Sequence, residues 1–134
     1  MNTYNWYSQL IKPTWSPPAW VFGPVWTILY MIIAISYGAV FYKVYTKKIK
    51  WTVALPFVLN LFFNLAFTPI QFGLKNNLLA SIDILFVVGT LMWALLSIWR
   101  ASPELRWVVY VNIPYLIWGT FATVLQLNIT YLNA

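Results

Sequence analysis

The side chains with chemical potential in this sequence are amides and aromatic rings placed inside long apolar stretches. Three amides and one ring recur at i, i+4, i+7 and i+11, the spacing of one helical face: Asn60, Asn64, Phe67 and Gln71. Hydrocarbon offers amides no hydrogen-bond partners, so this face must point into a helical bundle. Two interpretations stay open. The amides either only link helices, or some of them line a cavity and orient a ligand.

Two further helical faces are rich in aromatic residues. The first carries Trp26, Tyr30 and Tyr37, and the second carries Tyr115, Trp118, Ala122 and Gln126. Facing the amides, they would enclose a pocket with flat aromatic walls, a few neutral polar groups and no fixed charge. Such a pocket suits a large, planar, mostly apolar ligand. The alternative is that these rings pack the core or form an interfacial belt.

The sequence offers little to conventional catalysis. It contains no histidine and no cysteine, and it has only two acidic residues. A Ser-His-Asp set, a carboxylate pair and a metal cluster are therefore all missing from the sequence, which predicts no metal site and no firm catalytic residue. Asp83 is the only acid inside an apolar stretch, where a carboxylate is a functional candidate by default. We favour a structural role, in which Asp83 is neutral or is hydrogen-bonded to Asn, Tyr or Trp of another helix. The alternative is a proton-coupled transporter, for which Asp83 would be the one available group that substrate and proton could share.

Composition places the chain in a membrane. Of its 134 residues, 62% are hydrophobic and 7% are charged, against about 25% charged in a soluble domain. Charged residues separate four stretches that each exceed the roughly 20 residues needed to span a bilayer. We expect one all-α domain, an integral membrane bundle of about four transmembrane helices near 19–42, 52–72, 77–99 and 104–131. The proline- and tryptophan-rich segment 1–18 should lie over the mouth of the bundle as a lid.

Charge distribution predicts the orientation. Six basic residues fall in the loops after the first and third predicted helices: Lys43, Lys47, Lys48, Lys50, Arg100 and Arg106. Lys12 and Lys75 fall on the opposite side. The excess places those two loops in the cytoplasm and both termini outside. The net charge of +6 is dispersed between apolar segments and does not form a basic patch, so we expect no nucleic-acid partner.

Three segments carry a family resemblance that covers essentially the whole chain. Residues 6–30 read WYSQLIKPTWSPPAWVFGPVWTILY, a long pattern of rare residues. Residues 60–83 carry the asparagines and Asp83, and residues 114–123 read PYLIWGTFAT. These segments closely resemble the TspO/MBR family of tryptophan-rich sensory proteins and translocator proteins, also called peripheral benzodiazepine receptors.

The resemblance implies a protein that binds porphyrins, including protoporphyrin IX, and other planar aromatic ligands, as a sensor, carrier or regulator. Carried over by position, the pocket would involve Tyr7, Trp26, Tyr30, Asn64, Phe67, Gln71, Trp118 and Ala122. Trp26 and Trp118 match tryptophans proposed to act in light-dependent porphyrin breakdown, which leaves an enzymatic alternative beside small-molecule transport. No cofactor is required, and without His or Cys to ligate haem iron we expect metal-free porphyrin to be preferred. A homodimer is also implied.

The sequence departs from the family pattern in three ways. Family members usually have five helices, and this chain starts at the loop between their first and second, so we expect one wall of the bundle to be open. Gln126 replaces the family's asparagine. No basic residue follows Tyr131, so the sterol motif is incomplete. We expect a multi-pass protein of the bacterial inner membrane, or of the mitochondrial outer membrane in a eukaryote.

Overall fold

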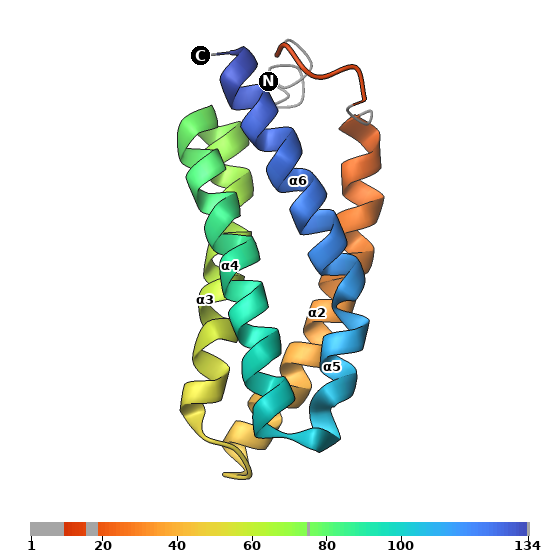
Figure 1. Ribbon diagram of the computed structural model, residues 1–134, viewed down its shortest axis with the longest axis vertical. Coiled ribbons are helices and arrows are strands. Elements are labelled where there is room, and N and C mark those ends of the chain that lie inside the picture. Colours follow the sequence, from red (N-terminus) through yellow and green to blue (C-terminus); the bar gives the residue numbers. More distant parts are fainter. Residues whose placement is uncertain (1–9, 16–18, 75, 134) are drawn as a thin grey trace.

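The computed structural model describes residues 10–15, 19–74 and 76–133, and within them every regular element is helical. Five helices run along the long axis (Figure 1). They are α2 (Phe22–Tyr45), α3 (Trp51–Thr68), α4 (Asn77–Ala101), α5 (Arg106–Val111) and α6 (Ile113–Leu132). Three short elements join them: the 3-10 turns η1 (Ala19–Val21) and η3 (Pro103–Leu105), and the π-helical turn η2 (Pro69–Gly73). The predicted all-α bundle is confirmed.

Length and composition indicate which of these helices could cross a membrane. α2 and α4 are each long and apolar enough to span it alone. The stretch from η3 to α6 qualifies as one span with a 43° bend, which gives up to three. The apolar part of α3, Trp51–Phe67, falls short of the span length, but η2 continues it, and together they run nearly as far as α4 (Figure 1). The four predicted segments thus correspond to α2, α3 with η2, α4, and η3 with α5 and α6.

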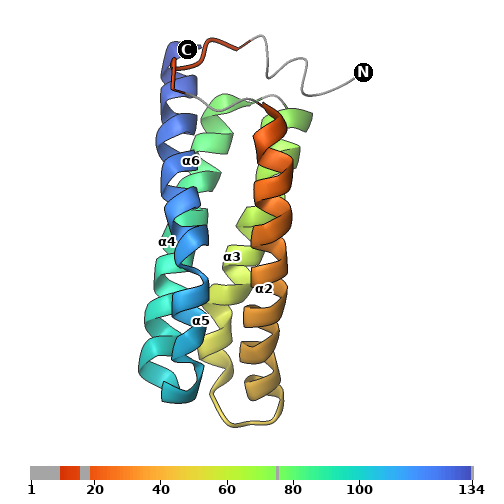
Figure 2. The ribbon, with the colours of Figure 1, turned by 90° about the vertical axis from the view of Figure 1, so that its right-hand side faces the viewer.

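α4 is the central helix of the bundle. It lies along both α3 and α6, whereas α2 meets α3 and α5 and diverges from α6 toward the end that holds the chain termini (Figures 1 and 2). A regular series of α4 side chains is buried: Ile84, Val87, Leu91, Ala94 and Ile98. Burial explains the apolar residues on this side of α4, whereas exposed apolar residues such as Leu85, Met92 and Leu96 on the other side suit contact with lipid.

The helix predicted over 104–131 is broken at Asn112, between α5 and α6. Pro114, in the first turn of α6, has no N–H to donate to a carbonyl one turn earlier. The buried side chain of Asn112 stabilises the break: its Nδ2 donates to the Val108 carbonyl at 2.8 Å and to Ser36 Oγ of α2 at 3.0 Å. The single-helix prediction was therefore wrong at this point, because a proline and a side-chain hydrogen bond together favour a bend.

The described part of the N-terminal segment lies across one end of the bundle (Figure 2). Ile11 and Asn133 exchange two hydrogen bonds, with Ile11 N donating to Asn133 Oδ1 at 3.1 Å and Asn133 Nδ2 donating to the Ile11 carbonyl at 2.9 Å. The Trp15 ring meets the edge of Phe121 with centroids 5.6 Å apart. Residues 1–9 and 16–18 lie outside the described residues, so the lid stays a prediction.

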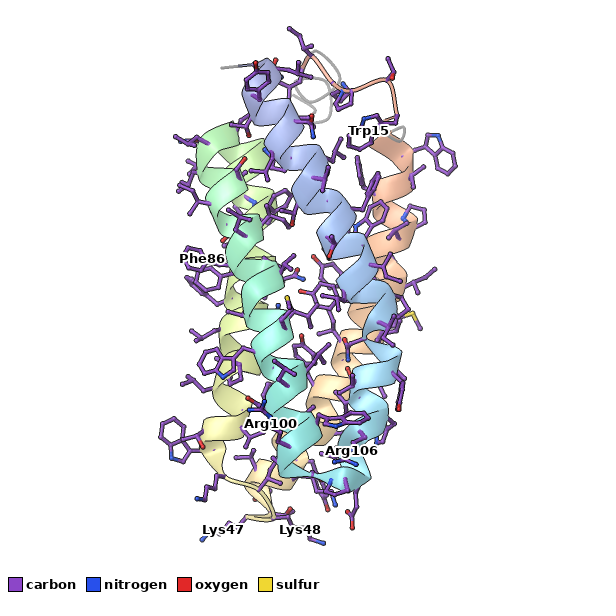
Figure 3. All side chains as sticks on the ribbon, viewed as in Figure 1. Trp15, Lys47, Lys48, Phe86, Arg100 and Arg106 are labelled. Carbon is purple, nitrogen blue, oxygen red and sulfur yellow. The ribbon has the colours of Figure 1, made fainter. Side chains whose placement is uncertain are left out.

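Basic side chains gather at the other end. Lys47, Lys48, Arg100 and Arg106 all lie there, far from Trp15 (Figure 3). Lys43 forms an ion pair with Glu104 at 2.9 Å, which ties the end of α2 to η3. This separation is the charge asymmetry that the sequence predicted; Lys75 lies outside the described residues.

Candidate ligand-binding site

An apolar groove of about 580 Å³ runs between α2 and α6. The groove forms where the two helices diverge, and side chains of both helices make its walls. Its lining residues are Val25, Ile28 and Leu29 of α2, and Pro114, Ile117, Trp118 and Phe121 of α6. The groove is open on one side, toward the surface that lipid would cover.

Aromatic rings surround this groove in two groups. On the α6 side, Trp118 meets the edge of Phe22 at 5.8 Å and lies tilted against Phe121 at 5.4 Å, centroid to centroid. On the α2 side, Trp26 stacks on Tyr30 at 5.6 Å and meets the edge of Tyr115 at 6.3 Å. Of these rings, only Trp118 and Phe121 line the groove, and Tyr115 is fully buried. The flat faces that could meet another π-system in the groove therefore belong to α6.

The indole N–H of Trp118 is a polar group without a partner in this apolar setting. Its Nε1 is buried, and no acceptor lies within hydrogen-bonding distance among the described residues. A buried donor left unpaired costs about 1–3 kcal/mol. Trp118 therefore offers the groove a stacking surface, whereas its N–H has no exposed surface there and would reach a ligand acceptor only after the indole ring turns.

Below the groove, a polar network joins the helices in the bundle interior. Asn60 Oδ1 accepts from the phenols of Tyr37 and Tyr115 at 2.7 and 3.0 Å. Its Nδ2 donates to the Val87 carbonyl at 2.8 Å and to Thr90 Oγ1 at 3.3 Å. Every hydrogen-bonding position of this amide is used, so Asn60 serves as a link between helices.

Asn64 and Asp83 differ from Asn60 because each keeps a buried oxygen unpaired. Asn64 Nδ2 donates to the Tyr115 phenol at 2.6 Å, but its Oδ1 has no partner in the described chain. Asp83 is 6% exposed, and its Oδ2 is likewise unpaired there. The sequence led us to expect a hydrogen bond from Asp83 to another helix, and Oδ2 forms no such bond in the described chain.

The predicted site residues fall into three groups. Trp118 lines the groove, while Trp26 and the 40% exposed Tyr30 form the stacked pair beside it. Asn64 belongs to the interior network, and the half-buried Phe67 and Ala122 pack against the core. Tyr7 lies outside the described residues, and of Gln71 only the backbone, within η2, is described.

Sequence reasoning missed the aliphatic wall of the groove. Val25 and Leu29 stand at i and i+4, as do Ile117 and Phe121, so helical spacing alone could have placed each pair on one face. These residues carry no polar group or rare residue type that separates them from the other apolar positions of the same helices. In a lipid-facing groove, aliphatic side chains make much of the surface.

A helical bundle of apolar spans, with charges at its ends and a tryptophan-lined groove inside, defines an integral membrane protein. Comparison of the sequence with known families identifies which one: the profile of the TspO/MBR family matches residues 1–132. The chain belongs to this family.

Several relatives from different kingdoms share most of the chain. The tryptophan-rich protein TspO of Bacillus cereus is 38% identical over 129 residues, covering 96% of this chain and 81% of the relative. The human translocator protein is 36% identical, covering 91% and 71%. The tryptophan-rich sensory protein of Cereibacter sphaeroides is 32% identical, covering 96% and 77%.

Proposed function

We propose that this protein binds a porphyrin, or a similar planar aromatic molecule, in the groove between α2 and α6. The observation that carries the proposal is the apolar groove with the Trp118 and Phe121 rings in its wall and the unpaired Trp118 indole N–H buried beside it. A porphyrin has a flat π-surface for the rings and carboxylate side chains that accept hydrogen bonds. Its apolar macrocycle fits the lining, and its polar edge fits Trp118.

The dimensions of the groove agree with this ligand class. A volume of about 580 Å³ lies within the roughly 300–1,000 Å³ typical of small-molecule pockets. The names of two relatives, tryptophan-rich sensory protein and translocator protein, favour a role as sensor or carrier. The protein would hold its ligand within the bilayer, in the bacterial inner membrane in our proposal.

Metal-free porphyrin should bind in preference to haem. The sequence has no histidine or cysteine, the usual axial ligands of haem iron. Among the described residues, no three His, Cys, Asp or Glu side chains gather into a metal site. Binding of either porphyrin then depends on stacking and hydrogen bonding, and the iron of haem strengthens neither interaction.

The first prediction tests this site by titrating protoporphyrin IX into purified protein and following the porphyrin absorbance in the dark. Trp118→Ala should weaken binding at least tenfold, because it removes both the ring and the N–H. Trp118→Phe keeps a ring and should weaken binding about fivefold, the value of one net hydrogen bond of about 1 kcal/mol.

The matched control is Trp93→Ala, which removes an α4 tryptophan that does not line the groove. It should leave the affinity unchanged. Equal losses at Trp93 and Trp118 would mean that the porphyrin adsorbs to any exposed tryptophan, and unchanged binding in Trp118→Ala would refute this site.

A second candidate function, light-dependent breakdown of bound porphyrin, is favoured by the position of Trp118 in the groove wall. The same titration decides it when illuminated. Loss of porphyrin absorbance that requires light and disappears in Trp118→Phe supports photochemistry, whereas bleaching equal to that of free porphyrin assigns the protein to binding alone. For a third function, transport, only Asp83 offers a proton site.

A further inference from the structure

A second cavity, of about 380 Å³, lies at the opposite end of the molecule from the termini, in the loop between α2 and α3. Its lining combines three lysines with apolar side chains: Val44, Lys47, Lys48, Ile49, Lys50 and Trp51. It is separate from the groove and shares no residue with it. Its chemistry is also different, because it concentrates positive charge where the bundle meets the membrane surface.

The three lysines of this cavity carry positive charge that the protein neutralises only in part. The sequence has only two acids, Glu104 and Asp83. Glu104 is paired with Lys43 at 2.9 Å, and Asp83 is buried within α4. Lys47, Lys48 and Lys50 are all exposed and form no ion pair in the described structure, although Lys48 lies close enough to Glu104 for their charges to interact. An anion from outside the chain is therefore the complement that this cavity lacks.

Lys47 occupies a position that disfavours a side chain. Its φ is 62°, the one positive φ recorded for a non-glycine residue in the described ranges. Lys48 N donates to the Lys43 carbonyl and Lys47 N to the Val44 carbonyl, both at 2.9 Å. This pair of bonds is the Schellman motif, whose left-handed residue is usually glycine. A lysine here therefore carries a conformational cost that a glycine would not.

The apolar part of the cavity fits the lipid side of an interface. Val44 and Ile49 contribute to its wall, and Trp51, 67% exposed, opens α3 at the depth where tryptophan prefers the headgroup boundary. Leu55, one turn further along α3, is also exposed. A molecule with a charged head in the cavity could continue as a hydrocarbon chain along Trp51 and Leu55.

From this combination we propose that the α2–α3 loop cavity binds the phosphate headgroup of an anionic phospholipid. Lys47, Lys48 and Lys50 contact the phosphodiester, and Trp51 packs against the start of an acyl chain. Each lysine near an anionic membrane surface contributes about 1 kcal/mol, or about fivefold in affinity. The loop then anchors the α2–α3 hairpin to one leaflet and prefers phosphatidylglycerol over phosphatidylcholine.

Lys47→Gly separates this proposal from an effect on folding. Glycine relieves the left-handed strain, so the melting temperature in phosphatidylcholine should rise by a few degrees. Binding of phosphatidylglycerol, titrated into protein in neutral detergent and counted by native mass spectrometry, should weaken about fivefold. Protoporphyrin affinity should not change, because the groove lies at the other end of α2; this result also distinguishes the two proposals if one fails.

Two comparisons make the outcome decisive. Arg100→Gln removes one exposed charge from the same end of the bundle but outside the cavity, and it should weaken phosphatidylglycerol binding by less than twofold. An equal loss in Lys47→Gly and Arg100→Gln, or no preference for phosphatidylglycerol, would overturn the site. Millimolar glycerol phosphate should not compete; full competition by that soluble headgroup would overturn a lipid as the ligand.

Discussion

At the scale of single residues, Asn60 shows how one amide can hold four helices. From α3 it accepts from the phenols of Tyr37 in α2 and Tyr115 in α6, and it donates to α4 at Val87 and Thr90. All of these groups are buried. Removing the amide would leave two phenols without their acceptor, in surroundings that offer few substitutes.

Asn60→Leu should therefore lower the free energy of unfolding by about 3 kcal/mol, since each buried unpaired donor costs about 1–3 kcal/mol. Asn64→Leu is the matched comparison: it loses one hydrogen bond but also removes an oxygen that is already unpaired, so the loss should be about 1 kcal/mol. Reversible unfolding by denaturant in mixed micelles measures both. Equal losses would contradict the role assigned to Asn60.

The sequence predicted that these amides share one face of α3, but it did not predict that Asn60 and Asn64 would differ in their hydrogen bonding. Spacing alone places Asn60 and Asn64 on the interior side of α3, where both are buried. Which amide becomes saturated depends on phenols from α2 and α6, whose register against α3 is set by packing along the whole bundle. Local periodicity holds no information on that register, and so left the structural and ligand-binding interpretations equally open.

At the scale of elements, the bend between α5 and α6 shapes the groove. Pro114 lies in the groove wall and also begins the helix that leans away from α2. The sequence showed this proline inside a predicted helix. It could not show the bend's direction, which depends on the hydrogen bond from Asn112 to Ser36 of α2.

Pro114→Ala should straighten this connection, because the restored N–H can donate to the carbonyl of Tyr110 one turn earlier. The chain has no cysteine, so spin labels at Thr27→Cys and Asn128→Cys report the separation of α2 and α6 without interference. The labelled distance should shift by roughly 5 Å or more over a helix of this length. Pro56→Ala in α3 is the control, and an equal distance distribution in all three proteins would show that the bend does not depend on Pro114.

At the scale of the whole molecule, packing is uneven. α4 has neighbours along both sides, while the first half of α2 faces the open groove (Figures 1 and 2). Composition predicted the bundle and its apolar spans, and charge spacing predicted the sequence of helices. The uneven packing was beyond prediction from one sequence, because it arises from the angles at which the helices cross.

Hydrogen exchange should reveal this difference in detergent. Backbone amides of residues 25–31 in α2 should exchange at least tenfold faster than those of residues 84–98 in α4, since local opening follows local packing. Mass spectrometry of peptic fragments resolves the two segments. Saturating protoporphyrin should slow exchange in α2 and leave α4 unchanged; uniform exchange across both helices would mean that the bundle opens as one unit.

The separation of α2 from α6 also bears on how long the protein survives. A molecule lodged between these helices contacts both, so it closes the least-packed seam of the bundle. Ligand that binds only the folded form adds RT ln(1 + [L]/Kd) to stability, about 2.7 kcal/mol at a hundredfold excess over Kd. Proteases that attack transiently opened chains would then degrade the empty protein first. Its abundance in the membrane would follow the supply of the molecule it binds, with no dedicated signalling partner needed.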